Sequence, residues 1–123
     1  LLGYRDDVSV LMSKARCRFV PSPNEAFGFI TAEAMYNGCI VVGKNTAGTK
    51  MQFDNCCSII GYDVFYRYLT SSELYNIMWE VTFVNKREVL TDLLKAQNCV
   101  LSLYSVQSSA QSVYKYYKSF LSV

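Results

Sequence analysis

Residues 18–42 read RFVPSPNEAFGFITAEAMYNGCIVV, and this stretch decides the fold class. The run 18–20 is typical of a short strand, and the prolines within 21–23 end it because proline cannot donate a ladder hydrogen bond. The residues from about Gly28 to Tyr36 predict a helix, and the apolar run 39–42 predicts a strand buried on both faces. Strand, helix and strand in this order predict a βαβ unit. We therefore expect an α/β domain with a Rossmann-like parallel sheet and flanking helices.

The segments on either side extend this pattern. Upstream, Asp6 or Asp7 can cap a helix whose apolar positions follow the spacing of one helical face. These positions are Val8, Leu11, Met12 and Ala15. Residues 1–3 predict the end of a preceding strand, and because they have neither an initiator Met nor a signal-peptide layout, we expect a fragment of a longer chain. Downstream, Gly43 and Gly48 predict a loop over residues 44–50, at the carboxyl end of the 39–42 strand.

Residues 63–123 predict mostly helices. Thr70 and Glu73 form a capping box at the start of one helix, and Asn85 and Glu88 resemble a second box that opens the next. The apolar stripes are Leu74, Ile77, Met78 and Val81 in the first helix, Val89, Leu90, Leu93, Leu94, Val100 and Leu101 in the second, and Val106, Ala110, Val113, Tyr117 and Phe120 or Leu121 in the last. We expect these stripes to be core faces.

The composition is that of one globular domain. The chain has 123 residues, of which 51% are hydrophobic and 18% charged, which excludes a disordered tail or a fibre. Twelve basic against ten acidic residues give a net charge of +2, too weak a field to indicate binding to nucleic acid. The chain has no histidine, which excludes Ser-His-Asp and Cys-His relays and histidine metal ligands from it.

Five cysteines, without a CxxC pair or a secretory signal, predict reduced thiols in a cytoplasmic protein. Cys17 and Cys39 lie beside strand-like runs, where we expect them to be buried as small apolar side chains. Cys56 and Cys57 are adjacent but lack further ligands at a useful spacing, so we predict no metal site. No apolar run approaches the roughly 20 residues that span a bilayer, which leaves only peripheral membrane contact open.

Chemistry is expected at the loop 21–28, because ligands of open parallel sheets bind outside the carboxyl ends of the strands. The unpaired N–H groups of the following helix favour a diphosphate there, and Gly28 lets the backbone approach closely. Glu25 and Glu33 flank this position and can accept hydrogen bonds from the hydroxyls of a sugar and a ribose. Spacing alone supports equally well that Glu25 caps the helix and that Glu33 is a solvated side chain.

A longer pattern surrounds the two glutamates. Residues 21–35, PSPNEAFGFITAEAM, followed by Gly38 to Val42, resemble the signature of the family-four retaining glycosyltransferases of the GT-B fold, the glycosyl transferases group 1. That signature reads P-S-x-x-E-x-F-G-x-x-x-x-E-A-M-x-x-G-x-P-V-V. Residues 2–8, LGYRDDV, look like the family's L-G-x-x-x-D-V segment. The resemblance covers roughly residues 1–62. It implies a partial C-terminal domain over 1–123 that binds a nucleotide sugar.

The resemblance implies roles for the matching positions. Glu25 looks like the first glutamate of the E-x7-E motif, the catalytic candidate, which helps to stabilise charge at the anomeric carbon of the transferred sugar. Glu33 looks like the second, which binds the ribose hydroxyls of the nucleotide. The backbone amides that hold the diphosphate and the sugar are those around Phe27, Gly28, Phe29 and Ile30. The rings of Phe27 and Phe29 we expect to be core aromatics. No metal or cofactor is implied, since the nucleoside-diphosphate sugar is the substrate.

The sequence departs from the family pattern in several places. The family's Gly-Gly-x-x-Glu loop corresponds to residues 47–51, AGTKM, so Met51 stands at the acidic position. Ile40 replaces the proline before Val-Val, and the usual glycine near the next strand falls among residues 56–58. The cations that neutralise the diphosphate in this family, and the N-terminal acceptor domain, are expected upstream of Leu1.

The resemblance implies the donor-binding part of a glycosyltransferase that moves a sugar to an acceptor hydroxyl with retention, with this fragment alone inactive, whereas the residues alone indicate a site for a diol and a diphosphate. The alternative is a non-catalytic nucleotide-binding, ligand-binding or interaction module, which Met51 and the missing cations favour. A dinucleotide-dependent oxidoreductase is disfavoured because no strand leads into G-x-G-x-x-G. If the first strands of the sheet are absent, an exposed strand edge and apolar helix stripes predict self-association.

Overall fold

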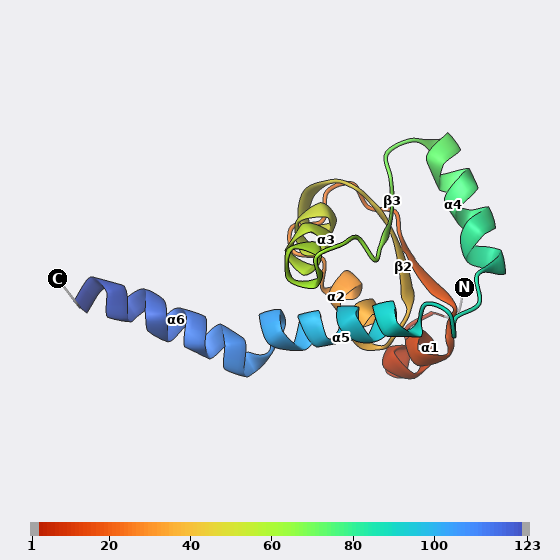
Figure 1. Ribbon diagram of the computed structural model, residues 1–123. Coiled ribbons are helices and arrows are strands. Elements are labelled where there is room, and N and C mark those ends of the chain that lie inside the picture. The colour runs from red at the N-terminus through yellow and green to blue at the C-terminus, as the bar shows by residue number, and fades with distance from the viewer. Residues whose placement is uncertain (1–2, 122–123) are drawn as a thin grey trace.

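A parallel sheet of three strands, in the order β1-β2-β3, organises the residues that the computed structural model describes, 3–121 (Figure 1). The strands are β1 (Cys17–Val20), β2 (Ile40–Lys44) and β3 (Tyr66–Tyr68). Helix α2 (Phe29–Tyr36) connects β1 to β2, and helix α3 (Ala47–Ile60) connects β2 to β3. The predicted α/β class with a Rossmann-like parallel sheet and flanking helices is confirmed.

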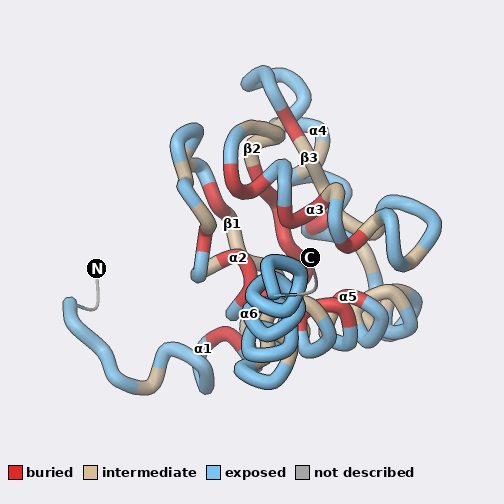
Figure 2. Tube along the Cα trace, turned by 90° about the vertical axis from the view of Figure 1, so that its left-hand side faces the viewer, coloured by how far each residue is buried: buried red, intermediate tan, exposed pale blue. Residues whose placement is uncertain are grey.

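The central strand β2 is buried on both faces. Ile40 and Val42 face one side of the sheet, which helix α4 (Ser71–Phe83) covers. Val41 faces the other side and the larger core cluster, where α2, α3 and helix α5 (Leu90–Tyr104) pack. Figure 2 shows the buried residues gathered on the strands and on the inward faces of these helices. A strand covered on both faces needs a continuous apolar run, as the sequence predicts.

Helix α1 (Val8–Lys14) is present as predicted, but the side chain before it does not cap it as predicted. Asp7 occupies the N-cap position without capping, because its carboxylate accepts hydrogen bonds from the Arg5 guanidinium at 2.7 and 2.5 Å. The strand end predicted at residues 1–3 falls largely on residues 1–2, which lie outside the described part. Gly3 itself is exposed and not in a strand.

The predicted loop 44–50 is wrong from Ala47 onward, where α3 begins. Residues 56–58, expected near the next strand, lie inside α3, and that strand is the short β3. Thr49, Gln52 and Phe53 of α3 are fully buried. Tertiary packing on the sheet therefore overrides the local signal for a loop.

The capping box of α4 is confirmed. Thr70 Oγ1 accepts from the Glu73 amide at 3.2 Å, and Glu73 Oε2 accepts from the Thr70 amide at 3.2 Å. The second box is wrong. Asn85 Oδ1 accepts from the Arg87 amide at 3.0 Å instead, in a turn that precedes α5. A side-chain bond two residues ahead forms an Asx turn and delays the helix.

Helix α6 (Val106–Leu121) is present as predicted, but its stripe is not a core face. None of the residues of this described helix is buried. Ser105 has extended backbone between α5 and α6, and α6 then projects away from the rest of the molecule (Figure 1). A regular apolar stripe therefore predicted the helix correctly and its burial wrongly.

The five cysteines lie among the described residues 3–121 and differ in burial. All five cysteines are free; Cys39 is buried as predicted, whereas Cys17 is half-buried. Burial raises the pKa of Cys56 to about 12. Within residues 3–121, no three His, Cys, Asp or Glu side chains are grouped so that they could hold a metal ion. In the same range, no helix combines the length and the apolar character needed to cross a membrane.

Candidate functional site at the carboxyl edge of the sheet

The carboxyl ends of β1 and β2 lie side by side, because Val20 pairs with Gly43 in the parallel register. The loop 21–28 leaves β1 at this edge, and the turn 45–46 leaves β2 beside it. Parallel strands place the loops that follow them at one end of the sheet. The loop that carries Glu25 therefore meets the start of α3.

Two hydrogen bonds fix this meeting. Thr46 Oγ1 donates to the Pro23 carbonyl at 2.9 Å, and the Gly48 amide donates to the Glu25 carbonyl at 2.7 Å. A Cβ at residue 48 would stand 2.4 Å from the Ala26 carbonyl oxygen and 2.6 Å from that of Glu25. Only glycine at position 48 allows the loop to lie this close to α3.

Gln52 of α3 holds the end of the loop 21–28 in place. Its side chain is fully buried, and its Nε2 donates to the carbonyl oxygens of Phe27 and of Gly28, the latter at 3.0 Å. Among the described residues, Gln52 Oε1 and Thr31 Oγ1 are buried without a hydrogen-bond partner. A buried amide that donates to two loop carbonyls restricts the loop, because losing those bonds would leave more polar atoms unsatisfied.

Gly28 is the N-cap of α2 and lies in the left-handed region, with φ +79°, where a side chain would be strained. Its carbonyl accepts from the Thr31 amide at 3.0 Å and the Ala32 amide at 3.3 Å. The amides of Phe29 and Ile30 therefore precede the first bonded donors of the helix. They lie at the positive end of the helix dipole, which favours an anion.

The two glutamates occupy different positions around this helix start. Glu25 is half-buried in the loop, and its Cβ lies 3.8 Å from the position that a Cβ on Gly28 would take. Glu25 does not cap α2, since Gly28 is the N-cap and no side chain caps it. Glu33 is exposed on α2, one turn before the helix ends at Tyr36.

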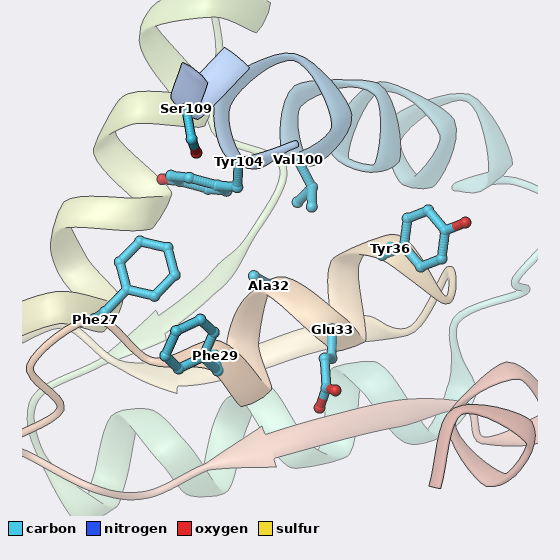
Figure 3. A pocket seen from close by; sticks show the side chains of 8 residues that line it. All are labelled: Phe27, Phe29, Ala32, Glu33, Tyr36, Val100, Tyr104 and Ser109. Carbon is cyan, nitrogen blue, oxygen red and sulfur yellow. The ribbon is translucent and has the colours of Figure 1, made fainter. Parts of the chain in front are cut away.

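A cavity of about 530 Å³ opens between α2 and the junction of α5 with α6 (Figure 3). Its lining residues are Phe27, Phe29, Ala32, Glu33, Tyr36, Val100, Tyr104 and Ser109. Phe27 packs edge-to-face on Phe29 and on Tyr104, with 5.0 Å between ring centroids in each pair. Burial raises the pKa of the Tyr104 phenol. Phe29 is 77% exposed, so its prediction as a core aromatic is wrong, whereas Phe27 is half-buried.

The carboxylate of Glu33 is turned away from the aromatic side chains of this cavity (Figure 3). In Figure 3 the Glu33 carboxylate points away from Tyr104 and Val100, on the other side of α2. The aromatic part of the cavity and the carboxylate of Glu33 therefore do not face each other. A ligand held by Glu33 would lie on the side of α2 away from α5.

Residues 1–58 match the family model of glycosyl transferases group 1. The match includes β1, α2, β2 and most of α3, and with them Glu25, Glu33 and Gln52. It covers slightly less than half of the 123-residue chain. It supports a role in sugar transfer in general. The chain has no significant match among curated proteins or solved structures.

The carboxylate of Asp54 pairs with two cations, Lys50 inside the matched region and Arg67 beyond it. Lys50 Nζ lies 2.7 Å from Asp54 Oδ2, and the Arg67 guanidinium lies 2.5 Å from Asp54 Oδ1. Arg67 is also 2.9 Å from Asp63 Oδ2. Lys50 first, and then Arg67, hold the pKa of Asp54 below its usual range. The charges of both cations are thus largely balanced within the fold.

Sequence reasoning missed two kinds of residue in this region. Gln52 and Thr46 act through contacts with a loop more than 20 residues away, which no local pattern reveals. Val100 and Tyr104 reach the cavity from α5, which lies beyond the part that matches glycosyl transferases group 1. Gly48 is different, because it matches the second glycine of the family's Gly-Gly-x-x-Glu loop. That match could have indicated that position 48 needs a glycine.

Proposed function

We propose that this chain is the donor-binding part of a retaining glycosyltransferase that transfers a sugar from a nucleoside-diphosphate sugar to an acceptor hydroxyl. The observation that carries the proposal is the fixed loop. Hydrogen bonds from Gly48 and Gln52 hold the backbone of Glu25, Phe27 and Gly28 at the start of α2. This is the sheet edge at which α/β domains bind ligands, and the match of residues 1–58 supports sugar transfer.

The residues around the start of α2 would each have a separate role in binding or catalysis. The amides of Phe29 and Ile30, at the positive end of α2, would bind the diphosphate. Glu25, in the loop just before them, would stabilise the positive charge that develops at the anomeric carbon in the transition state. Glu33, further along α2, would accept hydrogen bonds from the ribose hydroxyls.

The proposal treats residues 1–123 as one partial domain of a GT-B glycosyltransferase, with βα units over 1–62 and mostly helices over 63–123. The acceptor domain and the cations for the diphosphate would precede Leu1 in a longer cytoplasmic protein. The pairing of Lys50 and Arg67 with Asp54 supports this division, because it leaves neither charge free for the donor. The chain alone would therefore be inactive.

The role of Glu33 is tested by replacing it with alanine in the longer transferase. Loss of hydrogen bonds between a carboxylate and hydroxyls is expected to weaken donor binding about tenfold or more, measured by titration calorimetry. Glu88→Ala, which removes an exposed glutamate from the turn before α5, is the matched control and should leave affinity unchanged. Unchanged affinity and rate in Glu33→Ala would contradict the role.

A non-catalytic module is the second candidate, and the observation that favours it is Met51. The family's acidic residue corresponds to this position, which here is an exposed methionine on α3. Calorimetry of the 123-residue chain with several nucleoside diphosphates separates the two candidates. The transferase proposal expects little or no binding, because half a cleft lacks the cationic clamp. Clear binding, without sugar transfer by the longer protein, would favour the module.

A further inference from the structure

Helix α4 exposes a row of aromatic side chains. Tyr75, Trp79 and Phe83 follow one another at intervals of four residues on its solvent side, and all three are exposed. Their ring centroids are 6.3 Å apart for Tyr75 and Trp79, and 5.6 Å apart for the stacked Trp79 and Phe83. Scattered exposed apolar residues are ordinary, but a contiguous row of this kind marks an interaction surface.

Helix α6 exposes a second apolar surface. At about 100° per residue, its apolar side chains gather on one half of the helix and its Gln, Lys and most Ser residues on the other. The exposed apolar side chains are Val106, Val113, Tyr114, Tyr116, Tyr117, Phe120 and Leu121. A helix with this pattern is stable when something covers its apolar half.

The charges of the two helices are complementary. Helix α4 contains Glu73 and Glu80 and no basic residue, whereas α6 contains Lys115 and Lys118 and no acidic residue. Lys118 lies over the Tyr114 ring, 5.9 Å from its centroid, at the edge of the apolar half. An acidic flank beside one apolar row and a basic flank beside the other favour pairing of these two helices over pairing of either with itself.

The positions of the charges also select an orientation. Glu80 directly follows Trp79, and Lys118 directly follows Tyr117, so each charge is turned about 100° from its apolar neighbour in the same sense. Two helices of this kind bring their charged flanks together only when they pack antiparallel. The antiparallel arrangement also aligns the helix dipoles favourably.

The two helices lie at opposite ends of the molecule (Figure 1), so α6 does not cover α4 of its own chain. We propose that α6 of one copy packs antiparallel on α4 of a second copy, with Lys118 beside Glu80. In the proposed dimer a two-fold axis relates the copies, so the contact is made twice and each copy provides one α4 and one α6. This inference is independent of the proposed enzymatic function.

The first test uses the single tryptophan of the chain, Trp79, which lies in the proposed contact. Light scattering and sedimentation of the 123-residue chain are expected to give twice the mass of one chain, and dilution should shift the Trp79 emission to longer wavelength as water reaches the ring. Phe120→Ala on α6 is expected to raise the dissociation constant about tenfold or more. A monomer at high concentration, with emission that dilution leaves unchanged, would overturn the proposal.

The second test exchanges the charges. Glu80→Lys and Lys118→Glu should each raise the dissociation constant about tenfold, because each places like charges side by side in both contacts. Mixing the two variants should restore dimers, because each contact then pairs one acidic with one basic side chain. In one contact the acidic residue is on α4, and in the other it is on α6. Lys14→Glu on α1, a charge reversal outside both helices, is the matched control and should change nothing. Weakened dimers that mixing does not restore would overturn the pairing.

A third measurement asks whether a lipid surface covers α6 instead. The chain is incubated with vesicles of phosphatidylglycerol and phosphatidylcholine and then sedimented. The proposal expects the dimer to stay in solution, since its α6 is already covered. A chain that is monomeric and that sediments with the anionic vesicles, with loss of binding in Phe120→Ala, would replace the second copy by a membrane as the partner of α6.

Discussion

Strand β2 and helix α6 both carry the apolar pattern that their element needs, yet their surroundings are opposite. Ile40, Val41 and Val42 of β2 are buried between two layers of helices, whereas every residue of α6 that the structure describes is exposed or half-buried. The comparison shows that an apolar pattern determines the kind of element, while burial depends on a partner. The βα part of the chain contains the elements that cover its apolar faces, whereas the apolar half of α6 stays exposed among residues 3–121.

The largest difference is expected between two phenylalanines, one from each region. Phe53 of α3 is 0% exposed and stacks on Phe65 at 4.5 Å, whereas Phe120 of α6 is 62% exposed. Phe53→Ala should lower the free energy of unfolding by about 3–5 kcal/mol because it leaves a cavity. Phe120→Ala should change that of the monomer by less than about 0.5 kcal/mol. Denaturant unfolding at low protein concentration measures the change in the free energy of unfolding for both variants. Equal changes would contradict the proposed difference between the two regions.

The contact between Gly48 and the loop should be the next most sensitive. Gly48→Ala would push a Cβ against the carbonyl oxygens of Ala26 and Glu25, which are backbone atoms and cannot rotate away. We expect a loss of about 1–3 kcal/mol and faster hydrogen exchange of the Gly48 amide. Met51→Ala, an exposed position in the same helix, is the control and should stay within about 0.5 kcal/mol. A neutral Gly48→Ala would show that the loop is not held in place.

A change next to Gly48 should instead stabilise the fold. Ala47 has φ +48°, in the left-handed region that disfavours side chains with a Cβ. The family's loop has glycine at this position, so Ala47→Gly removes strain at the first residue of α3. We expect a gain of up to about 1 kcal/mol, measured as a higher melting temperature. A lower melting temperature would mean that the flexibility of glycine in the unfolded chain outweighs the strain.

The smallest expected effect comes from Asp54. Lys50 and Arg67 keep the pKa of its carboxyl below the ordinary 3.8, so its contribution to stability is present above that value and is lost as pH falls through the lowered pKa. The side chain is 46% exposed, so solvent limits the contribution to less than about 1 kcal/mol. Asp54→Asn should therefore narrow the difference in stability between neutral pH and about pH 3. A variant with the same pH dependence as the wild type would contradict this.

The elements that the sequence predicts well are those whose signals are local. The β1–α2–β2 unit follows from the prolines, from the helix expected between about Gly28 and Tyr36 and from a continuous apolar run, all within residues 18–42. The capping box of Thr70 and Glu73 is also local, since both hydrogen bonds span three residues. In these places the local preference and the final packing agree.

The elements that the sequence misses depend on contacts between distant residues. Helix α3 begins where Gly48 meets Glu25, although the glycines at positions 43 and 48 are typical of a loop. Strand β3 has three residues and is defined by its pairing with β2. In the candidate site, the motif locates Glu25, Gly28 and Glu33, but the hydrogen bonds of Gln52 could not be inferred from any spacing along the chain.

The most direct test of the proposed donor site is the Glu25→Gln variant of the proposed longer transferase, assayed with a nucleotide-sugar donor. The substitution keeps the shape of the side chain and removes its charge, and Glu25 is proposed to act in the transition state. We predict that kcat falls about 100-fold or more while KM changes little, with the variant folded as the wild type. An unchanged kcat, or a loss confined to KM, would contradict the role of Glu25 and with it the proposed site.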